Sequence, residues 1–454
     1  MDQVLPVPNP TKAYWLSEPH ELARFRSTPD LPATCDVAII GSGMAGITTA
    51  YHLLHSNKQP PNVVILEARE LCSGATGRNG GHCKVKVPTF AGFTPGPGSS
   101  TVDDMAVYVH GIINGLKQIV EEEELDCEFE LRRSFDIQLD DDESKRLKRI
   151  YDESAKAGST WTRTVDYIDE RFAGQITSIN GANTAFTGPA CSFWPYKFVS
   201  QLLARLLAQH PRSLNFQTMT PATSVTLSED GSSAIHTSRG SFKAEKVVFA
   251  TNPYTSGLIS QFNDIITPIR GMTSHIVPKQ PIHPHLSNTY NIDFGPEKGT
   301  DYLNPRPDGS IVVGGGKWLY NSDRPSWFNN FDDSMPFPPQ TEEYWEGYMQ
   351  RNFRGWEESG AELDKVWVGI MGITPDGWPH VGRVPGVKNQ WMLAGFNGGG
   401  MSMILTVAKA VATMVKEDAG FDEVAGGLGV PDFWGTSEER LRVGKDEDLM
   451  VKRK

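Results

Sequence analysis

Cysteine is scarce in this sequence, and so are the spacings that would give it a structural role. The 454 residues include five cysteines, an odd number, and none of them forms a CxxC or another metal-ligand pattern. Domains stapled by disulfides and zinc-binding domains show the opposite pattern. We therefore expect reduced thiols, a cytoplasmic protein and no metal site.

Long apolar runs and an excess of basic residues are absent as well. No run reaches the roughly 20 residues that span a bilayer, and the start, MDQVLPVPNP, lacks the basic and apolar regions of a secretory signal. Lys and Arg number 43 against 55 Asp and Glu, which gives a formal net charge of −12. We expect neither a nucleic acid nor a membrane surface as a partner, because both are anionic.

Glycine, in contrast, is plentiful, and its first cluster lies in a β-α-β unit. CDVAII is typical of a buried strand, GSGMAG follows it, ITTAYHLLHSN continues as a helix, and VVILEA is the next strand. Gly41, Gly43 and Gly46 fit the G-x-G-x-x-G pattern, and Glu67 ends the second strand 21 residues after Gly46. A strand, a helix and an acidic residue in these places predict a dinucleotide site, with the phosphates at the helix N-terminus and the ribose at Glu67.

A second glycine cluster, GATGRNGGHC at residues 74–83, follows that unit. Four glycines in ten residues carry an entropic cost, so this loop needs an unusual backbone shape or a very close approach to a ligand. An NAD site needs no such second loop after its acidic residue. An extended FAD does, because a second loop has to meet its diphosphate and its ring.

Two further patterns are missing from the rest of the chain. No second strand–glycine–helix fingerprint follows, since no helix is expected after the glycines of IVVGGGKWLYNSDRP, and no CxxC follows the first β-α-β unit. A nicotinamide site and a disulfide reductase are therefore not expected. The flavin would then be reduced by an organic substrate.

The motifs GSGMAG, LEA, GATGRNGG, ATN, TPDG and GFNGGGM together resemble those of the FAD-dependent D-amino acid oxidase and glycine oxidase superfamily. The GRNGG loop resembles in particular that of the γ-glutamylputrescine oxidase-like branch. The resemblance implies an α/β fold with a Rossmann-like FAD domain of the glutathione reductase type and an α+β substrate domain on a mostly antiparallel sheet. A chain of this length is also expected to hold two domains. The expected segments are residues 1–105, 190–258 and 366–434 for the FAD domain, 106–189 and 259–365 for the substrate domain, and 435–454 as a charged tail.

The resemblance also implies the cofactor contacts. The first glycine loop would meet the pyrophosphate and the second would wrap the diphosphate, the ribityl chain and the ring edge. Glu67 would bind the ribose, Arg69 and Val225 would lie at the adenine, and the last glycine loop would face the flavin ring at a helix N-terminus. The complete set is Gly41, Ser42, Gly43, Met44, Ala45, Gly46, Glu67, Ala68, Arg69, Gly74, Ala75, Thr76, Arg78, Asn79, Gly80, Gly81, His82, Val225, Ala250, Thr251, Gly398, Gly399, Gly400, Met401 and Ser402.

The chemistry implied by the resemblance is oxidation of an amine or amino acid. The C–N bond becomes an imine as a hydride passes to flavin N5, with O2 as acceptor and H2O2 as product. A dehydrogenase with another acceptor and a flavin-binding protein without catalysis are the alternatives. Gly369 stands where sarcosine oxidase-like members carry the cysteine that attaches FAD, so non-covalent FAD is expected, with His82 and Cys83 as possible exceptions.

Five residues are candidates for the substrate side, each with a plainer interpretation beside it. His82 borders the flavin or is a loop histidine bonded to backbone. Lys84 replaces a family arginine or lies on a solvated strand face with Lys86. Lys317 reaches the ring and promotes reaction with oxygen, or it points away. Tyr302 and Trp378 are pocket walls or core aromatics. Ser402 replaces a family lysine that pairs with a substrate carboxylate, so an amine without an obligatory α-carboxylate is expected.

Overall fold

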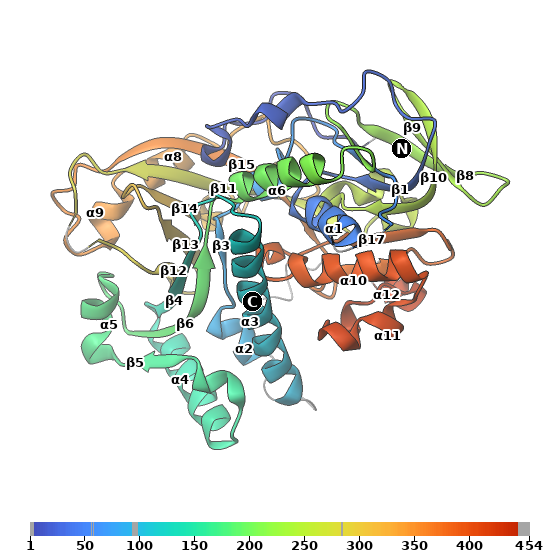
Figure 1. The fold of residues 1–454 in the computed structure, drawn as a ribbon. Coiled ribbons are helices and arrows are strands. Elements are labelled where there is room, and N and C mark those ends of the chain that lie inside the picture. The colour runs from blue at the N-terminus through green and yellow to red at the C-terminus, as the bar shows by residue number, and fades with distance from the viewer. Residues whose placement is uncertain (1–3, 56, 58, 93–98, 283–284, 444–454) are drawn as a thin grey trace.

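The computed structural model describes residues 4–55, 57, 59–92, 99–282 and 285–443. Two sheets organise them (Figure 1). The first sheet is parallel at its centre, in the order β17-β10-β1-β2-β7, with β16 antiparallel at its edge and β8 and β9 joined to β10. Its strands are β1 (Thr34–Ile40), β2 (Val63–Leu66), β7 (Leu214–Gln217), β8 (Ala222–Leu227), β9 (Ser233–Thr237), β10 (Gly240–Phe249), β16 (His380–Arg383) and β17 (Gln390–Ala394).

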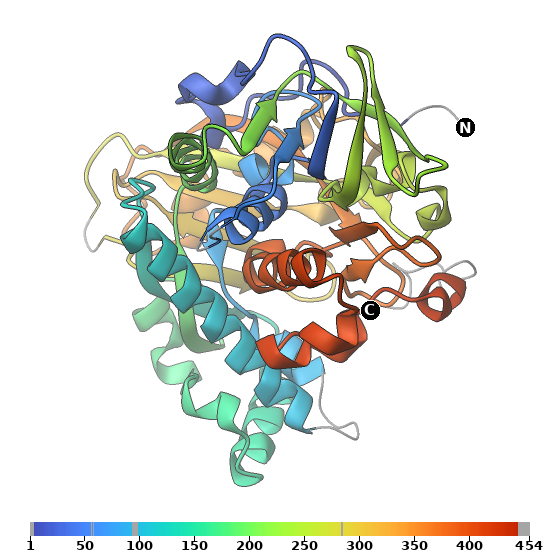
Figure 2. The same ribbon diagram turned by 45° about the vertical axis from the view of Figure 1, so that its right-hand side comes forward.

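The parallel strands of this sheet are apolar and must be covered, and helices cover one of its faces. All four residues of β2 are buried, as are the last four of β1. α1 (Met44–Leu54) packs against α10 (Ile404–Glu417) and α6 (Pro195–Gln209). α1 and α10 lie side by side in both views (Figure 2). The fingerprint helix is thus held between two other helices, and its N-terminus is fixed at the end of β1.

The second sheet is antiparallel except for the pair β4–β12, in the order β15-β11-β14-β13-β12-β4-β6-β3, with β5 beside β6. Its strands are β3 (His82–Cys83), β4 (Glu130–Gln138), β5 (Asp166–Ile168), β6 (Thr184–Ser192), β11 (Thr267–Val277), β12 (Thr289–Asp293), β13 (Thr300–Pro305), β14 (Ile311–Gly315) and β15 (Glu362–Ile373). The predicted fold class is confirmed. The domain boundaries stay a prediction, and β3, inside the segment expected for the FAD domain, pairs into the second sheet.

The remaining helices pack around these sheets. They are α2 (Val87–Gly92), α3 (Ser99–Glu122), α4 (Asp141–Lys156), α5 (Glu170–Thr177), α7 (Arg324–Trp327), α8 (Gln340–Trp345), α9 (Tyr348–Asn352), α11 (Phe421–Val424) and α12 (Glu438–Val443). Within the described part of the chain, no helix is both long and apolar enough to cross a bilayer.

The expected charged tail begins as ordered structure. The Arg440 side chain on α12 donates to Asp376 Oδ2 and to the carbonyls of Trp378, Pro379, Trp434 and Gly435. Residues 444–454 of the tail lie outside the described residues.

Candidate functional site

A cavity of about 840 Å³ runs from the start of α1 to one face of the second sheet. The volume falls within the range of small-molecule and cofactor sites. At one end it is lined by the first glycine loop and by Glu67, and at the other by β11, β12 and β13 of the second sheet. The cavity is also walled by residues 74–76, 78–80 and 396–404. The two glycine loops that the sequence singled out are therefore brought to one cavity.

The first glycine loop has the shape of a dinucleotide site. Gly41 has φ +112°, and a Cβ there would lie 2.5 Å from the Ala250 carbonyl oxygen. The Glu67 carboxylate accepts hydrogen bonds from the backbone N–H of Ser42 at 3.1 Å, from the Ser42 hydroxyl at 2.6 Å and from the backbone N–H of Arg69 at 2.9 Å. These bonds hold the acidic side chain at the cavity wall, as a ribose contact requires.

Side-chain N–H groups of neighbouring segments hold the second glycine loop by hydrogen bonds to its carbonyl groups. Trp367 Nε1 donates to the Arg78 carbonyl at 2.9 Å, and Trp15 Nε1 donates to the Asn79 carbonyl at 2.5 Å. Asn304 Nδ2 donates to the carbonyls of both Gly80 and Gly81. In a planar trans peptide the next N–H points the opposite way. The N–H groups of Asn79 and Gly80 are therefore turned to the cavity side, where a phosphate or a flavin edge can accept hydrogen bonds.

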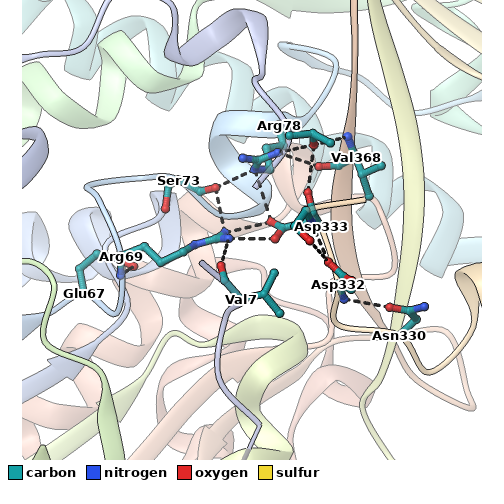
Figure 3. A network of polar contacts seen from close by, with 11 residues as sticks. Val7, Glu67, Arg69, Ser73, Arg78, Asn330, Asp332, Asp333 and Val368 are labelled. Carbon is teal, nitrogen blue, oxygen red and sulfur yellow. Dashed lines mark hydrogen bonds and ion pairs between the residues drawn. The ribbon is translucent and has the colours of Figure 1, made fainter. Parts of the chain in front are cut away.

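The two arginines of this region are held by a buried carboxylate (Figure 3). Arg69 Nη1 and Nη2 bind the two oxygens of Asp333 at 2.9 and 3.0 Å. Arg78 Nε lies 3.6 Å from Asp333 and donates to the Ser73 carbonyl, and its Nη1 donates to the Val368 carbonyl. Burial lowers the pKa of Arg78 to about 10, against the attraction of Asp333. Both residues line the cavity, but their guanidinium groups are occupied by protein acceptors rather than free for a diphosphate or an adenine.

One row of the second sheet faces the cavity. Strand register aligns six residues across it, and directly opposite residues share a face. From β4 to β15 they are Asp136, Asn291, Tyr302, Gly314, Thr273 and Trp367. Asn291, Tyr302 and Thr273 line the cavity. The Tyr302 hydroxyl lies 2.8 Å from Thr273 Oγ1, and a Cβ at Gly80 would lie 2.7 Å from the Tyr302 ring. The ring is thus fixed directly against the second glycine loop.

His82 lines the cavity beside this ring, with centroids 5.5 Å apart. Its Nδ1 is buried without a hydrogen-bond partner, and burial lowers the pKa of His82 well below its usual value. This nitrogen is therefore left with neither a protein partner nor solvent contact. Cys83, the next residue, is fully buried and lies opposite Cys191 in the β3–β6 strand pair. Of the two residues considered for covalent attachment, only His82 lines the cavity.

Lys84 and Lys86 line the same end of the cavity. Lys84 Nζ donates to Ser134 Oγ at 2.8 Å and to the Tyr290 carbonyl at 2.9 Å. Burial lowers the pKa of Lys84 to about 7, with Asp136 opposing the shift. Burial also lowers the pKa of Lys86. These two lysines are therefore not on a solvated strand face.

The last glycine loop closes the cavity from the other side. Residues 398–402 line it, and a short turn (Gly400–Ser402) precedes the start of α10 at Ile404. The Ser402 hydroxyl donates to the Lys84 carbonyl at 2.7 Å and accepts from the Lys84 N–H at 3.1 Å. It therefore joins two walls of the cavity. Gly369 also lines the cavity, and a Cβ there would lie 3.3 Å from Arg78 Cβ.

Lys317 and Trp378 also line the cavity. The Lys317 ammonium lies 4.5 Å from the centre of the Trp327 ring, and burial lowers its pKa. Trp378 stacks with Trp434 at 6.2 Å between ring centroids. All five side chains proposed for the substrate side therefore reach one cavity, while their roles stay predictions.

Val225 does not line the cavity, in contrast to the expectation from the sequence; Thr220 and Ala222 line it instead. A register shift between Ala222 and Ser224 in the β8–β9 pair changes which residues face inward, and Val225 packs against the core of the first sheet.

Three other residues expected at the cofactor stand behind the wall. The Met44 N–H donates to Thr76 Oγ1 at 3.0 Å, so it is not available to a phosphate. Gly46 packs against the Gly41 carbonyl, as the fingerprint requires, and Gly81 lies against the Trp15 ring. Their contribution is to hold the loops rather than to line the cavity.

Sequence reasoning missed several cavity residues. Asn291, Thr273 and Arg270 line the cavity, but the sequence patterns did not single them out. Val4, Leu5 and Pro6 were not considered because no motif marks them. Strand register relative to Tyr302 would have found Asn291 and Thr273; no local signal would have found the N-terminal residues.

The residues present fit FAD. The first glycine loop lines the cavity beside Glu67, which hydrogen bonds hold at the wall, and Asn79 and Gly80 line the cavity farther along. At the far end the buried Nδ1 of His82 lacks a protein partner. A dinucleotide with an extended second half matches both ends.

Comparisons with known proteins agree with this geometry. Residues 36–414 match the family model described as FAD dependent oxidoreductase (DAO). Glycine oxidase from Geobacillus kaustophilus superposes with a TM-score of 0.67 at 18% identity, over 85% of this chain and 95% of that one. L-proline dehydrogenase from P. horikoshii gives 0.65 at 20% identity, over 85% and 94%. Gamma-glutamylputrescine oxidoreductase of Escherichia coli (strain K12) is 38% identical over 71 residues, which are 16% of this chain and 16% of that protein.

The two structures share the fold, and the sequence relative shares only a short segment. The family model, in contrast, spans both glycine loops, both sheets and most of α10. The chain belongs to the FAD dependent oxidoreductase family, and its cofactor is FAD.

Proposed function

We propose that the protein oxidises the C–N bond of an amine or amino acid to an imine, with O2 as the electron acceptor. The observation that carries the proposal is the polar end of the cavity. Beyond the second glycine loop the space continues along Asn291, Tyr302 and Thr273, with Lys84 and Lys86 beside them. A small polar substrate fits there, next to the FAD loop.

When bound, FAD supplies the acceptor for the hydride that leaves the carbon bonded to nitrogen. Tyr302 forms a rigid wall against Gly80, because its ring lies against Gly80 and Gly314 and its hydroxyl is tied to Thr273. It orients the substrate at the cofactor loop. Burial keeps His82 neutral, and the residue lines the cavity beside Tyr302.

A substrate amine must be unprotonated before the hydride leaves, and Lys84 is suited to take its proton. Its pKa is about 7, so near neutral pH a large fraction of the side chain is an –NH2 group. Two hydrogens go to Ser134 Oγ and the Tyr290 carbonyl. The lone pair is then left to accept a proton, and a pKa near the working pH favours such a base.

The charge of this end supports O2 as the acceptor. Lys86, Arg270 and Lys317 line the cavity, and Lys84 joins them as a cation once it has taken the substrate proton. Among the described residues no carboxylate lies within 4.0 Å of their charged nitrogens. Transfer of electrons to O2 first creates negative charge, which nearby cations stabilise. Two electrons and two protons complete H2O2.

The names of these relatives are compatible with this chemistry. Glycine oxidase and gamma-glutamylputrescine oxidoreductase are named for nitrogen-bearing substrates. L-proline dehydrogenase also has such a substrate in its name, but its name is that of a dehydrogenase and not of an oxidase. An acceptor other than O2 is therefore the alternative that an experiment must separate.

The test is to mix the purified yellow holoprotein with a panel of primary and secondary amines and amino acids without oxygen. The expected result is bleaching of the flavin absorbance by some of these compounds, followed by recovery of the colour and formation of H2O2 when air is admitted. The Lys84→Met variant should bleach more slowly near neutral pH with the same compounds. Bleaching without recovery in air would show that the electron acceptor is not O2. Bleaching by hydroxy acids alone would refute amine oxidation.

A further inference from the structure

The N-terminal segment of residues 4–16, here called the strap, lies outside the fingerprint but forms part of the cavity wall. Val4, Leu5 and Pro6 line the cavity. Val4 packs on Gly257, where a Cβ would lie 2.6 Å from the Val4 carbonyl oxygen. The Val7 carbonyl accepts a hydrogen bond from Arg69 Nη1 at 3.1 Å. The strap thus approaches the Glu67 end of the cavity from outside the Rossmann unit.

Thr11 is the main tie between the strap and the rest of the site. Its N–H and its hydroxyl both donate to the Asp333 carbonyl, at 2.7 and 3.1 Å. The same hydroxyl accepts from Arg78 Nη1 at 3.2 Å and from the Val368 N–H at 2.9 Å. One donor and two acceptor positions are all used, which is the full capacity of a hydroxyl group.

The end of the strap holds the second glycine loop itself. Trp15 is fully buried, its Nε1 donates to the Asn79 carbonyl, and its ring occupies the place of a side chain at Gly81. Trp194 Nε1 donates to the Trp15 carbonyl at 2.7 Å. The loop that faces the cofactor is therefore fixed partly by the strap.

We propose that the strap is part of the FAD-binding site and that Thr11 is a positioning residue for cofactor retention. Val4–Pro6 of the strap line the cavity. Thr11 and Trp15 tie the strap to the second glycine loop. Release of FAD requires the wall at Val4–Pro6 to open, and the ties at Thr11 resist that opening. Looser ties also disturb the N–H groups of Asn79 and Gly80, since Arg78 and Trp15 hold the same loop.

The experiment measures the rate at which FAD leaves the holoprotein after dilution, followed by the rise of free flavin fluorescence. Thr11→Val keeps the shape but leaves the Val368 N–H without an acceptor and removes one of the hydrogen bonds of Arg78, so release should be faster by a factor on the order of ten. Leu5→Ala opens the wall without removing a hydrogen bond, and it should also accelerate release.

Thr177→Val is the matched control. Thr177 is fully buried in α5, donates to the Ala173 carbonyl and accepts from the Ile179 N–H, and does not line the cavity. It should lower the melting temperature while FAD leaves at the wild-type rate. Wild-type release rates in both Thr11→Val and Leu5→Ala, or equal acceleration in Thr177→Val, would overturn the proposal. The readout is independent of the amine, so the proposed substrate chemistry can fail while this inference stands.

Discussion

Replacing Lys84 by methionine should remove a definite part of the protein's pH dependence. The ammonium has two neutral oxygen partners, Ser134 Oγ and the Tyr290 carbonyl, and no carboxylate partner. Burial lowers its pKa from 10.5 to about 7, while Asp136 on β4 opposes the shift. Methionine has a similar length and no charge.

The sign follows from the direction of the shift. Between pH 7 and 10.5 the unfolded chain keeps the Lys84 proton and the folded chain loses it. The unfolded state then binds more protons, so the free energy of unfolding rises with pH in this window. One group contributes at most about 1.4 kcal/mol per pH unit, and integration from pH 7 to pH 9 gives about 2 kcal/mol.

The assay is urea unfolding of the wild type and Lys84→Met at pH 7 and pH 9, with FAD in excess and several probes to check for a single transition. Titrating groups that do not interact with Lys84 contribute equally to both proteins, so the difference between their pH dependences reports Lys84 together with its neighbours Asp136 and Lys86. The wild type should gain about 2 kcal/mol more than the variant on going to pH 9. Equal gains would refute the lowered pKa of Lys84. The rate of anaerobic flavin bleaching should also rise through pH 7 in the wild type and lose this step in the variant.

The remaining predictions concern the cofactor and oxygen. Gly43→Val should abolish FAD binding, because the added side chain occupies cavity space and its Cβ would lie 3.2 Å from Thr76 Oγ1; full FAD content after purification would contradict this, and the measurement is the ratio of flavin to protein absorbance. Acid or heat denaturation should release the colour into the supernatant, since position 369 is glycine and Cys83 does not line the cavity; colour in the pellet would point to His82. Lys317→Met should slow reoxidation of the flavin by O2, because it removes a positive charge that stabilises the negative charge formed on O2. Stopped-flow traces should show unchanged reduction of the flavin by substrate. Slower reduction with unchanged reoxidation would mean that Lys317 contacts the substrate instead.

The sequence predicted the local parts of the site well, because local patterns encode them. Gly41 follows a buried strand and Gly46 lies in the first turn of the next helix, and the structure has both elements with the expected close contacts. The second glycine loop was expected at the same cavity, and it lines it. A register shift between two strands is harder to predict from residue types. The shift after Ala222 in the β8–β9 pair changes which residues of β8 face the cavity, and Val225 is not among them.

Long-range partners could not be predicted from the sequence. Arg69 and Arg78 were expected at the cofactor, but Asp333, more than 250 positions later, holds both guanidinium groups. Nothing near residue 333 marks that carboxylate as buried. The same holds for Trp15, whose indole N–H reaches a carbonyl 64 positions away. These contacts depend on how the two sheets and the strap come together, which no local periodicity describes.

The most direct test of the account is anaerobic reduction of the bound FAD by candidate substrates, with a diode-array record of the flavin spectrum. The account predicts that at least one amine or amino acid bleaches the flavin completely, that one equivalent of substrate suffices, and that an imine or its carbonyl hydrolysis product forms. Complete bleaching by hydroxy acids or polyols, with no response to any primary or secondary amine, would contradict it.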